Sequence, residues 1–101
     1  MDIAYIRVSS IDQKTDRQLL DLKVDKIFTE KVSAKDVNRP QLQAMIDYVR
    51  EGDTIHVHSI DRLARNLKDL QELIETINAK GCTIKFHSEN LTFQAGLDDA
   101  L

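Results

Sequence analysis

The chain has 101 residues, 42% of them hydrophobic, and this length and composition are typical of one globular domain with a single core. Its formal net charge of −3 excludes a domain that holds DNA by electrostatic attraction alone, because such binding depends on a surplus of basic side chains. No run of about 18 apolar residues is present to cross a membrane, and the single cysteine, Cys82, leaves no internal disulfide, so we expect a protein of the reducing cytoplasm.

The first half of the chain predicts a strand, a helix, a second strand and a loop. Ile3 to Val8 is an almost continuous apolar and β-branched run, which is typical of a strand buried on both faces. Thr15 to Gln18 has the form of a capping box, and the leucines after it supply the buried stripe of a helix. Lys26 to Thr29 predicts a short second strand. Glu30 to Asn38 is polar and longer than an ordinary turn, so we expect a mobile loop there.

The second half predicts two more helices and two more strands. Pro40 suits the first turn of a helix, where its missing N–H costs no hydrogen bond, and Gly52 is expected to end that helix. Thr54 to His58 predicts a third strand. The next helix is closed by Gly81, and Thr83 to Phe86 predicts the fourth strand. The apolar positions at helical spacing are Leu42, Met45, Ile46 and Val49 in the first of these helices, and Leu67, Leu70, Ile74 and Ile77 in the second.

Alternating strands and helices of this kind indicate an α/β fold with a mainly parallel sheet. The prediction is a flavodoxin-like, three-layer domain with a four-stranded sheet of order 2-1-3-4 and helices on both faces. In that order the topological switch point lies between the first and third strands. The loops that follow those two strands are therefore expected to form the active-site crevice.

The residues at the predicted switch point are a serine, a carboxylate and several arginines. Period-two alternation puts Arg7 and Ser9 on one face at the end of the first strand. Asp61, Arg62 and Arg65 follow the third strand, and Arg39 at the end of the polar loop supplies a further guanidinium. Arginine keeps its charge and binds phosphate oxygens with two parallel hydrogen bonds. Arginines around a serine therefore suit attack on a phosphodiester, where negative charge grows during the reaction.

Each of these signals also has an ordinary structural interpretation. Arg7 can be an ion-pair partner of Asp61, Ser9 and Ser10 can cap a turn, and the charges after the third strand can be a solvated helix entry. The placement of all of them at one crevice favours the catalytic interpretation.

Five segments in order resemble the serine recombinases of the resolvase and invertase type, and the resemblance covers nearly the whole chain. Tyr5-x-Arg7-Val-Ser9 is similar to the nucleophile segment of that family, and Gln13 and Gln18 fall where the family carries active-site glutamines. The remaining similar segments are Asn38-Arg39-Pro40, the block from Glu51-Gly-Asp53 to Asp61-Arg62-Leu63-x-Arg65, and the stretch from Phe86 through Glu89 to Phe93.

The resemblance implies a mechanism and a set of roles. Ser9 attacks a DNA phosphodiester, forming a 5′-phosphoserine link and a free 3′-hydroxyl. Arg7, Arg62 and Arg65 bind the scissile phosphate, and Arg39 joins them from the loop. Asp61 either orients the arginines or handles a proton at the leaving oxygen, and the polar groups of Gln13 and Gln18 support the site.

The resemblance also implies the partners. Members of the family use no metal and no nucleotide cofactor, and they act on DNA as homodimers at each site and as tetramers in the synaptic complex. They serve resolution, inversion or transposition, and these outcomes use the same catalytic residues. A typical member continues into a long dimerisation helix and a helix-turn-helix domain. We therefore expect residues 1–101 to be a catalytic domain truncated before both, monomeric or weakly associating by itself, and inactive.

Three other classes of function are alternatives to a recombinase. A non-catalytic module that pairs with full-length subunits is the main alternative. A phosphoryl-accepting receiver domain requires acidic residues for magnesium after the first and third strands, where this chain has Arg7 and Ser9. A metal-dependent nuclease requires paired carboxylates. A metal site built from His56, His58 and His87 is not favoured, because no carboxylate or thiolate completes the set.

Overall fold

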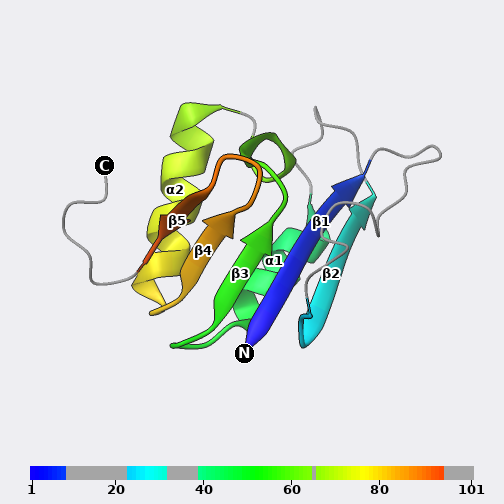
Figure 1. The fold of residues 1–101 in the computed structure, drawn as a ribbon, viewed down its shortest axis with the longest axis vertical. Coiled ribbons are helices and arrows are strands. Elements are labelled where there is room, and N and C mark those ends of the chain that lie inside the picture. The colour runs from blue at the N-terminus through cyan, green and yellow to red at the C-terminus, as the bar shows by residue number, and fades with distance from the viewer. Residues whose placement is uncertain (9–22, 32–38, 65, 95–101) are drawn as a thin grey trace.

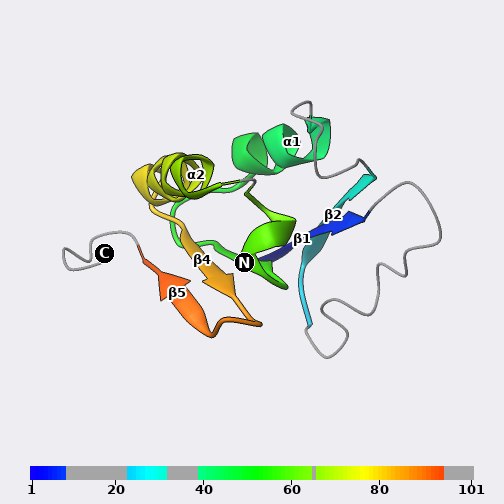
Figure 2. The same ribbon diagram turned by 90° about the horizontal axis from the view of Figure 1, so that it is seen from above.

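The structure, a computed structural model, describes residues 1–8, 23–31, 39–64 and 66–94. In these parts of the chain, a five-stranded sheet carries two α-helices and a short 3₁₀ helix. Both α-helices lie on the same face of the sheet (Figures 1 and 2). The elements in chain order are β1 (Asp2–Val8), β2 (Lys26–Lys31), α1 (Pro40–Tyr48), β3 (Thr54–Val57), the 3₁₀ helix η2 (Ile60–Arg62), α2 (Leu67–Ala79), β4 (Thr83–Phe86) and β5 (Leu91–Phe93).

The sheet has the order β2-β1-β3-β4-β5, and the first four strands are parallel to one another. This confirms the predicted order 2-1-3-4. β5 adds a fifth strand that the sequence did not predict, and it runs antiparallel to β4. With only three residues, Leu91–Phe93 is too short for an alternating apolar pattern to be recognised as a strand.

The two described α-helices agree with the predicted ones, apart from one boundary and one buried position. α1 ends at Tyr48 rather than at Gly52, because Val49 already has the extended backbone angles φ −70° and ψ 154°. Gly52 instead adopts φ +93° in the turn before β3, a conformation that favours glycine. Leu67 was expected in the buried stripe of α2, but its side chain is exposed. It is the first residue of the helix and lies one turn before Leu70, which packs against the core.

The helix predicted after Thr15 lies outside the described residues, so a helix layer on the second face of the sheet stays a prediction. Ala4 and Ile6 of β1 are nevertheless buried without belonging to the main core cluster. This agrees with a first strand that is buried on both faces. Among the described residues, no helix combines the length and apolar character needed to span a membrane.

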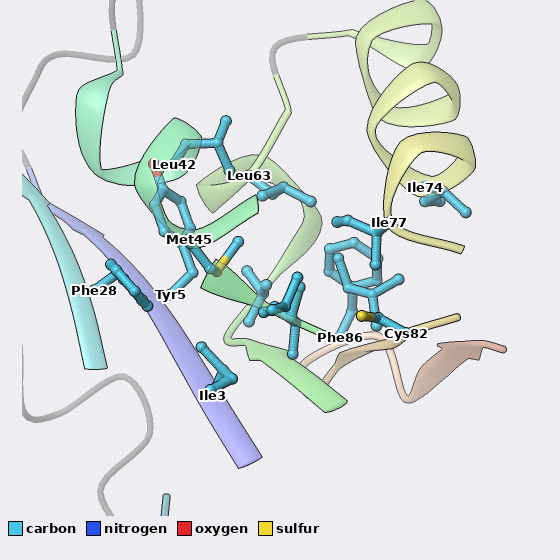
Figure 3. Close-up of a cluster of buried hydrophobic side chains, with 14 of the residues drawn as sticks. Ile3, Tyr5, Phe28, Leu42, Met45, Leu63, Ile74, Ile77, Cys82 and Phe86 are labelled. Carbon is cyan, nitrogen blue, oxygen red and sulfur yellow. The ribbon is translucent and has the colours of Figure 1, made fainter. Parts of the chain in front are cut away.

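The main core lies between the sheet and the two helices (Figure 3). Tyr5 of β1, Met45 of α1 and Ile77 of α2 are all fully buried there. Cys82, just before β4, is also fully buried and packs there as a small apolar side chain. The core therefore fixes β1 and both helices against each other, and these are the elements that border the site.

A buried carboxylate ties the start of α1 to the sheet. Glu30 is 2% exposed and accepts hydrogen bonds from the backbone N–H groups of Gln41 and Leu42, at 3.1 and 2.8 Å. Such N–H groups in a first helical turn have no partner within the helix, and the helix dipole favours negative charge there. Glu30 therefore acts as the N-terminal cap of α1, in place of Arg39, whose side chain makes no cap hydrogen bond.

The prediction that Glu30 belongs to a loop is wrong. β2 continues to Lys31, and Glu30 follows Phe28 on the inward-facing side of the strand. The Tyr5 hydroxyl donates to the same carboxylate at 3.2 Å. Burial, and then the charge of Glu30, raises the pKa of Tyr5 far above its usual range, so the hydroxyl remains a donor at neutral pH.

Replacing Glu30 with alanine is expected to lower the free energy of unfolding by roughly 2–4 kcal/mol, because the Tyr5 hydroxyl and two helix N–H groups lose their acceptor. Urea unfolding followed by far-ultraviolet circular dichroism measures the change. The matched control is Glu75→Ala at an exposed position of α2, which is expected to change the free energy by less than about 0.5 kcal/mol. A similarly small effect of Glu30→Ala would mean that α1 does not depend on this carboxylate.

Candidate active site

The site forms where β1 extends past the pairing with its neighbour β3. The two strands pair in parallel from Asp2↔Thr54 to Tyr5↔Val57. The last residues of β1 therefore run on beside the turn that follows β3 and contains η2 (Figure 1). This is the carboxyl edge of the parallel strands, where the sequence predicted the site.

Arg7 of β1 and Arg62 of η2 each donate a side-chain hydrogen bond to the backbone carbonyl oxygen of the other. Arg7 is 9% exposed, and its Nε donates to the carbonyl oxygen of Arg62 at 2.9 Å. Its Nη2 donates to the carbonyl oxygen of Asp61. In return, Arg62 Nη1 donates to the carbonyl oxygen of Arg7 at 3.4 Å. The structure therefore brings together three predicted site residues, Arg7, Asp61 and Arg62.

Arg39 joins the same turn from the start of α1. Its Nη1 donates to the carbonyl oxygen of Leu63, and its Nη2 lies 3.3 Å from Oδ2 of Asp69 in α2. The side chain is 8% exposed. Within the described residues, its Nε has no hydrogen-bond partner. Arg39 thus connects α1 to the segment that joins η2 to α2.

The close approach of the arginines has an electrostatic cost. Burial lowers the pKa of Arg7, and repulsion from the Arg39 and Arg62 guanidinium groups lowers it further, against the opposing effects of Tyr5 and Asp61. Even so, an arginine remains charged at neutral pH. Positive charge is therefore concentrated at this edge of the sheet, and an anion that binds there relieves the repulsion.

Asp61 is kept in its charged form chiefly by a neighbouring hydroxyl. Ser59 Oγ donates to Asp61 Oδ1, and this hydrogen bond lowers the pKa of the Asp61 carboxyl. Desolvation opposes the change, and the charge of Arg62 adds to it. Asp61 is consequently ionised at neutral pH beside Arg7 and Arg62.

Four predicted site residues lie outside the described residues: Ser9, Gln13, Gln18 and Arg65. Their participation stays a prediction. Ser9 is the second residue after Arg7 in the sequence, and Arg65 is the third after Arg62.

Several residues that contact the site were not identified from the sequence. Ser59 binds the Asp61 carboxylate, Asp69 pairs with Arg39, and Glu89 accepts from the backbone N–H of Ile60 at 3.2 Å with each oxygen. The only available signal for Ser59 was its position two residues before Asp61, a spacing typical of a hydroxyl that closes a turn. Asp69 and Glu89 contact the site across the fold, so no local pattern reveals them.

The histidines considered as metal ligands make other contacts. His56 Nδ1 lies 2.9 Å from His87 Nε2, and His56 Nε2 lies 3.0 Å from Asp2 Oδ1. Across the part of the chain that the structure describes, no cluster of three or more histidine, cysteine or acidic side chains is arranged to hold a metal ion.

The chemistry available at this edge is anion binding and charge stabilisation. Arg7 and Arg39 donate to the turn that carries Arg62, and the planar groups of all three match the oxygens of a phosphate. Asp61 is the ionised carboxylate within that group. Donors fixed in advance in this way stabilise a negative charge that develops during a reaction.

Comparison with known proteins gives a consistent family. A family model described as "Resolvase, N terminal domain" matches residues 3–100. The transposon Tn501 resolvase of Pseudomonas aeruginosa is 54% identical over 91 residues, which make up 90% of this chain and 49% of that protein. The DNA-invertase hin of Salmonella typhimurium is 44% identical over 89 residues, or 85% of this chain and 46% of that protein. The chain spans about half the length of these relatives.

A solved structure supports the same assignment. A serine recombinase from Sulfolobus solfataricus is 28% identical and superposes with a TM-score of 0.64, covering 82% of this chain and 66% of that one. The sheet order and the arginine-rich edge of the sheet agree with the resemblance found in the sequence. With a family match over residues 3–100, the chain belongs to the resolvase and invertase family of serine recombinases and corresponds to its N-terminal domain.

Proposed function

We propose that this chain is the catalytic domain of a site-specific DNA recombinase in which Ser9 is the nucleophile. The observation that carries the proposal is the convergence of Arg7 and Arg39 on the turn that carries Arg62, at the carboxyl edge of the sheet. Arg7 lies at this edge, Ser9 follows it by two residues in the sequence, and the chain belongs to a family of serine recombinases. A concentration of guanidinium groups next to a serine suits a phosphodiester substrate.

The proposed reaction is a transesterification. The Ser9 hydroxyl loses its proton as Oγ bonds to phosphorus, and the bond between phosphorus and the DNA 3′-oxygen breaks. That oxygen takes up a proton and leaves as a 3′-hydroxyl, so the 5′ end stays attached to Ser9 as a phosphoserine. Attack of a 3′-hydroxyl on the phosphoserine reverses these steps after strand exchange. Each step forms one phosphate ester bond for the one that it breaks, so no nucleotide cofactor is required.

The arginines supply the stabilisation that this reaction requires. Negative charge grows on the nonbridging oxygens during attack, and Arg7, Arg39, Arg62 and Arg65 bind those oxygens. A single fixed donor of this type contributes about 2.7–4 kcal/mol to lowering a barrier. Asp61 orients the arginines or handles the proton at the leaving oxygen, while Gln13 and Gln18 support the polar site.

The rest of the protein provides DNA binding and assembly. The chain carries a net charge of −3, which is unsuited to holding DNA by itself. In the full-length protein, the proposed assemblies are a homodimer on each DNA site and a tetramer in the synaptic complex, in the cytoplasm. The isolated 101-residue chain is proposed to bind DNA weakly and to catalyse no recombination. Whether the protein serves resolution, inversion or transposition depends on that assembly rather than on these residues.

The nucleophile is tested by trapping its covalent intermediate. The chain is joined to the part of the Tn501 resolvase that follows the matched region, and the fusion is incubated with supercoiled DNA carrying two recombination sites of that transposon. Detergent arrests the reaction, and mass spectrometry maps the attached residue. We expect a phosphoserine at Ser9 with chelator present, no adduct in Ser9→Ala, and wild-type amounts in the control Ser10→Ala. Absence of any adduct on well-bound, paired sites would favour a non-catalytic pairing module instead.

The role of the arginines is tested at Arg62, which is only partly buried. Arg62→Lys keeps the charge but removes the planar fork, so cleavage is expected to slow by about a hundredfold or more while binding of the fusion to its DNA site is unchanged. The rate of adduct formation and a gel-shift titration measure the two quantities.

The matched control for Arg62→Lys is Arg50→Lys. Arg50 is exposed in the turn before β3, at the opposite edge of the sheet. Equal rates for the wild type and Arg62→Lys would contradict a phosphate-binding role for Arg62.

A further inference from the structure

In its described part, the turn between β3 and α2 carries Asp61 and Arg62, two of the proposed catalytic residues, and hydrogen bonds from several elements hold it. η2 consists of three residues, Ile60–Arg62, and none of them is buried. Arg7 and Arg39 hold carbonyl oxygens of the turn at Asp61, Arg62 and Leu63. None of those contacts involves the Asp61 carboxylate or the backbone N–H of Ile60, the first residue of η2. Each of these two groups has a different partner.

The partner of the Asp61 carboxylate is Ser59. This serine precedes η2 in an extended conformation, with φ −149° and ψ 162°, and it is 8% exposed. Its Oγ donates to Asp61 Oδ1. Asp61 itself is exposed, so the fixed hydroxyl of a buried neighbour limits the orientations of a carboxylate that otherwise rotates in solvent.

The partner of the first N–H group of η2 is Glu89, which comes from a different part of the fold. The sheet pairing between β3 and β4 continues past the strand ends, with His87 N donating to the carbonyl of Val57 and Ser88 N donating to that of His58, at 3.0 and 2.7 Å. This brings the turn between β4 and β5 beside η2. Both carboxylate oxygens of Glu89 lie 3.2 Å from the backbone nitrogen of Ile60.

We propose that Ser59 and Glu89 are positioning residues of this recombinase domain, Ser59 by holding the Asp61 carboxylate and Glu89 by holding the backbone at the start of η2. Neither residue is proposed to touch DNA. The inference rests on the proposed function, because the positions that it explains are those of Asp61 and Arg62. Loss of either contact widens the range of orientations available to these two side chains, and a misplaced catalytic group slows a reaction steeply.

The charged groups that face Asp61 determine how its pKa responds to the loss of the Ser59 hydroxyl. Arg62 lies beside it on η2, and Arg7 approaches from β1, so both favour the carboxylate. Glu89, in the turn after β4, lines a shallow surface pocket together with Asp61 and adds a negative charge there. The hydrogen bond from Ser59 is the largest cause of the lowered pKa of Asp61. A carboxyl group that loses a donor to its charged form holds its proton to higher pH, so removing the hydroxyl raises the pKa.

The contacts are tested first without any activity measurement. Carbon-detected nuclear magnetic resonance of the 101-residue chain follows the titration of the Asp61 carboxyl group. Its midpoint is expected to move to higher pH in Ser59→Ala and to stay near the wild-type value in Ser59→Thr, which keeps a hydroxyl. In Glu89→Ala the Ile60 amide is expected to exchange with solvent about tenfold faster or more, whereas Glu89→Gln keeps a carbonyl acceptor and the protection.

The consequence for the reaction is tested in the fusion with the second half of the Tn501 resolvase. Ser59→Ala is expected to move the acidic limb of the cleavage rate to higher pH, because Asp61 then becomes protonated at higher pH, and Ser59→Thr to restore the profile. Glu89→Ala is expected to slow cleavage by about tenfold to a hundredfold, and Glu89→Gln by less than about threefold, with DNA-site binding unchanged in all four variants.

Specific outcomes overturn the inference. An unchanged Asp61 titration in Ser59→Ala, or a Ser59→Thr protein as impaired as Ser59→Ala, removes the role of the hydroxyl. A wild-type cleavage rate in Glu89→Ala would show that the contact between Glu89 and the Ile60 backbone has no role in positioning. Equal losses of cleavage rate in Glu89→Ala and Glu89→Gln would show the same. Failure of the proposed function is distinguishable, because the wild-type fusion then forms no adduct whatever the titration and exchange of these variants show.

Discussion

The arrangement of the site depends on a negative charge buried beneath it. Glu30 is enclosed between β1, β2 and the first turn of α1, and it receives donors from a tyrosine hydroxyl and two helix N–H groups. A buried carboxylate with these partners is stable, whereas one that lost them would be costly. Through this contact the direction of α1 is tied to the sheet. Arg39 immediately precedes α1, so the approach of its guanidinium to η2 follows from the placement of Glu30.

The arginines of the site have both a structural role and a chemical role. Arg7 and Arg39 direct donors to backbone carbonyl oxygens, which hold these buried side chains without neutralising their charge. A separate carboxylate partner for every arginine would cancel most of the positive potential. The three guanidinium groups of Arg7, Arg39 and Arg62 are instead accompanied by two carboxylates, those of Asp61 and Asp69. The site thus keeps an excess of positive charge within a chain that is acidic overall.

The sequence was sufficient for the strand order and the switch point, because long apolar strands and amphipathic helices carry strong periodic signals. It also identified Arg7, Asp61 and Arg62 as neighbours, since all three lie at the ends of adjacent parallel strands. It failed for β5, whose three residues include one buried side chain, and for Glu30, a carboxylate where an apolar residue is expected. It also failed for Ser59, because a serine two residues before a carboxylate is common in ordinary turns, and for Glu89, because a hydrogen bond between a side chain and a distant backbone group leaves no pattern in the sequence.

The use of carbonyl oxygens as partners has a consequence for how this site tolerates change. Every residue has a carbonyl oxygen, so the hydrogen bonds from Arg7 and Arg39 to positions 61, 62 and 63 do not depend on which side chains occupy them. The frame of the turn and the chemistry displayed on it are therefore separable. Mutation can alter the reactive groups while the scaffold persists, so a domain of this kind can lose its chemistry and still fold.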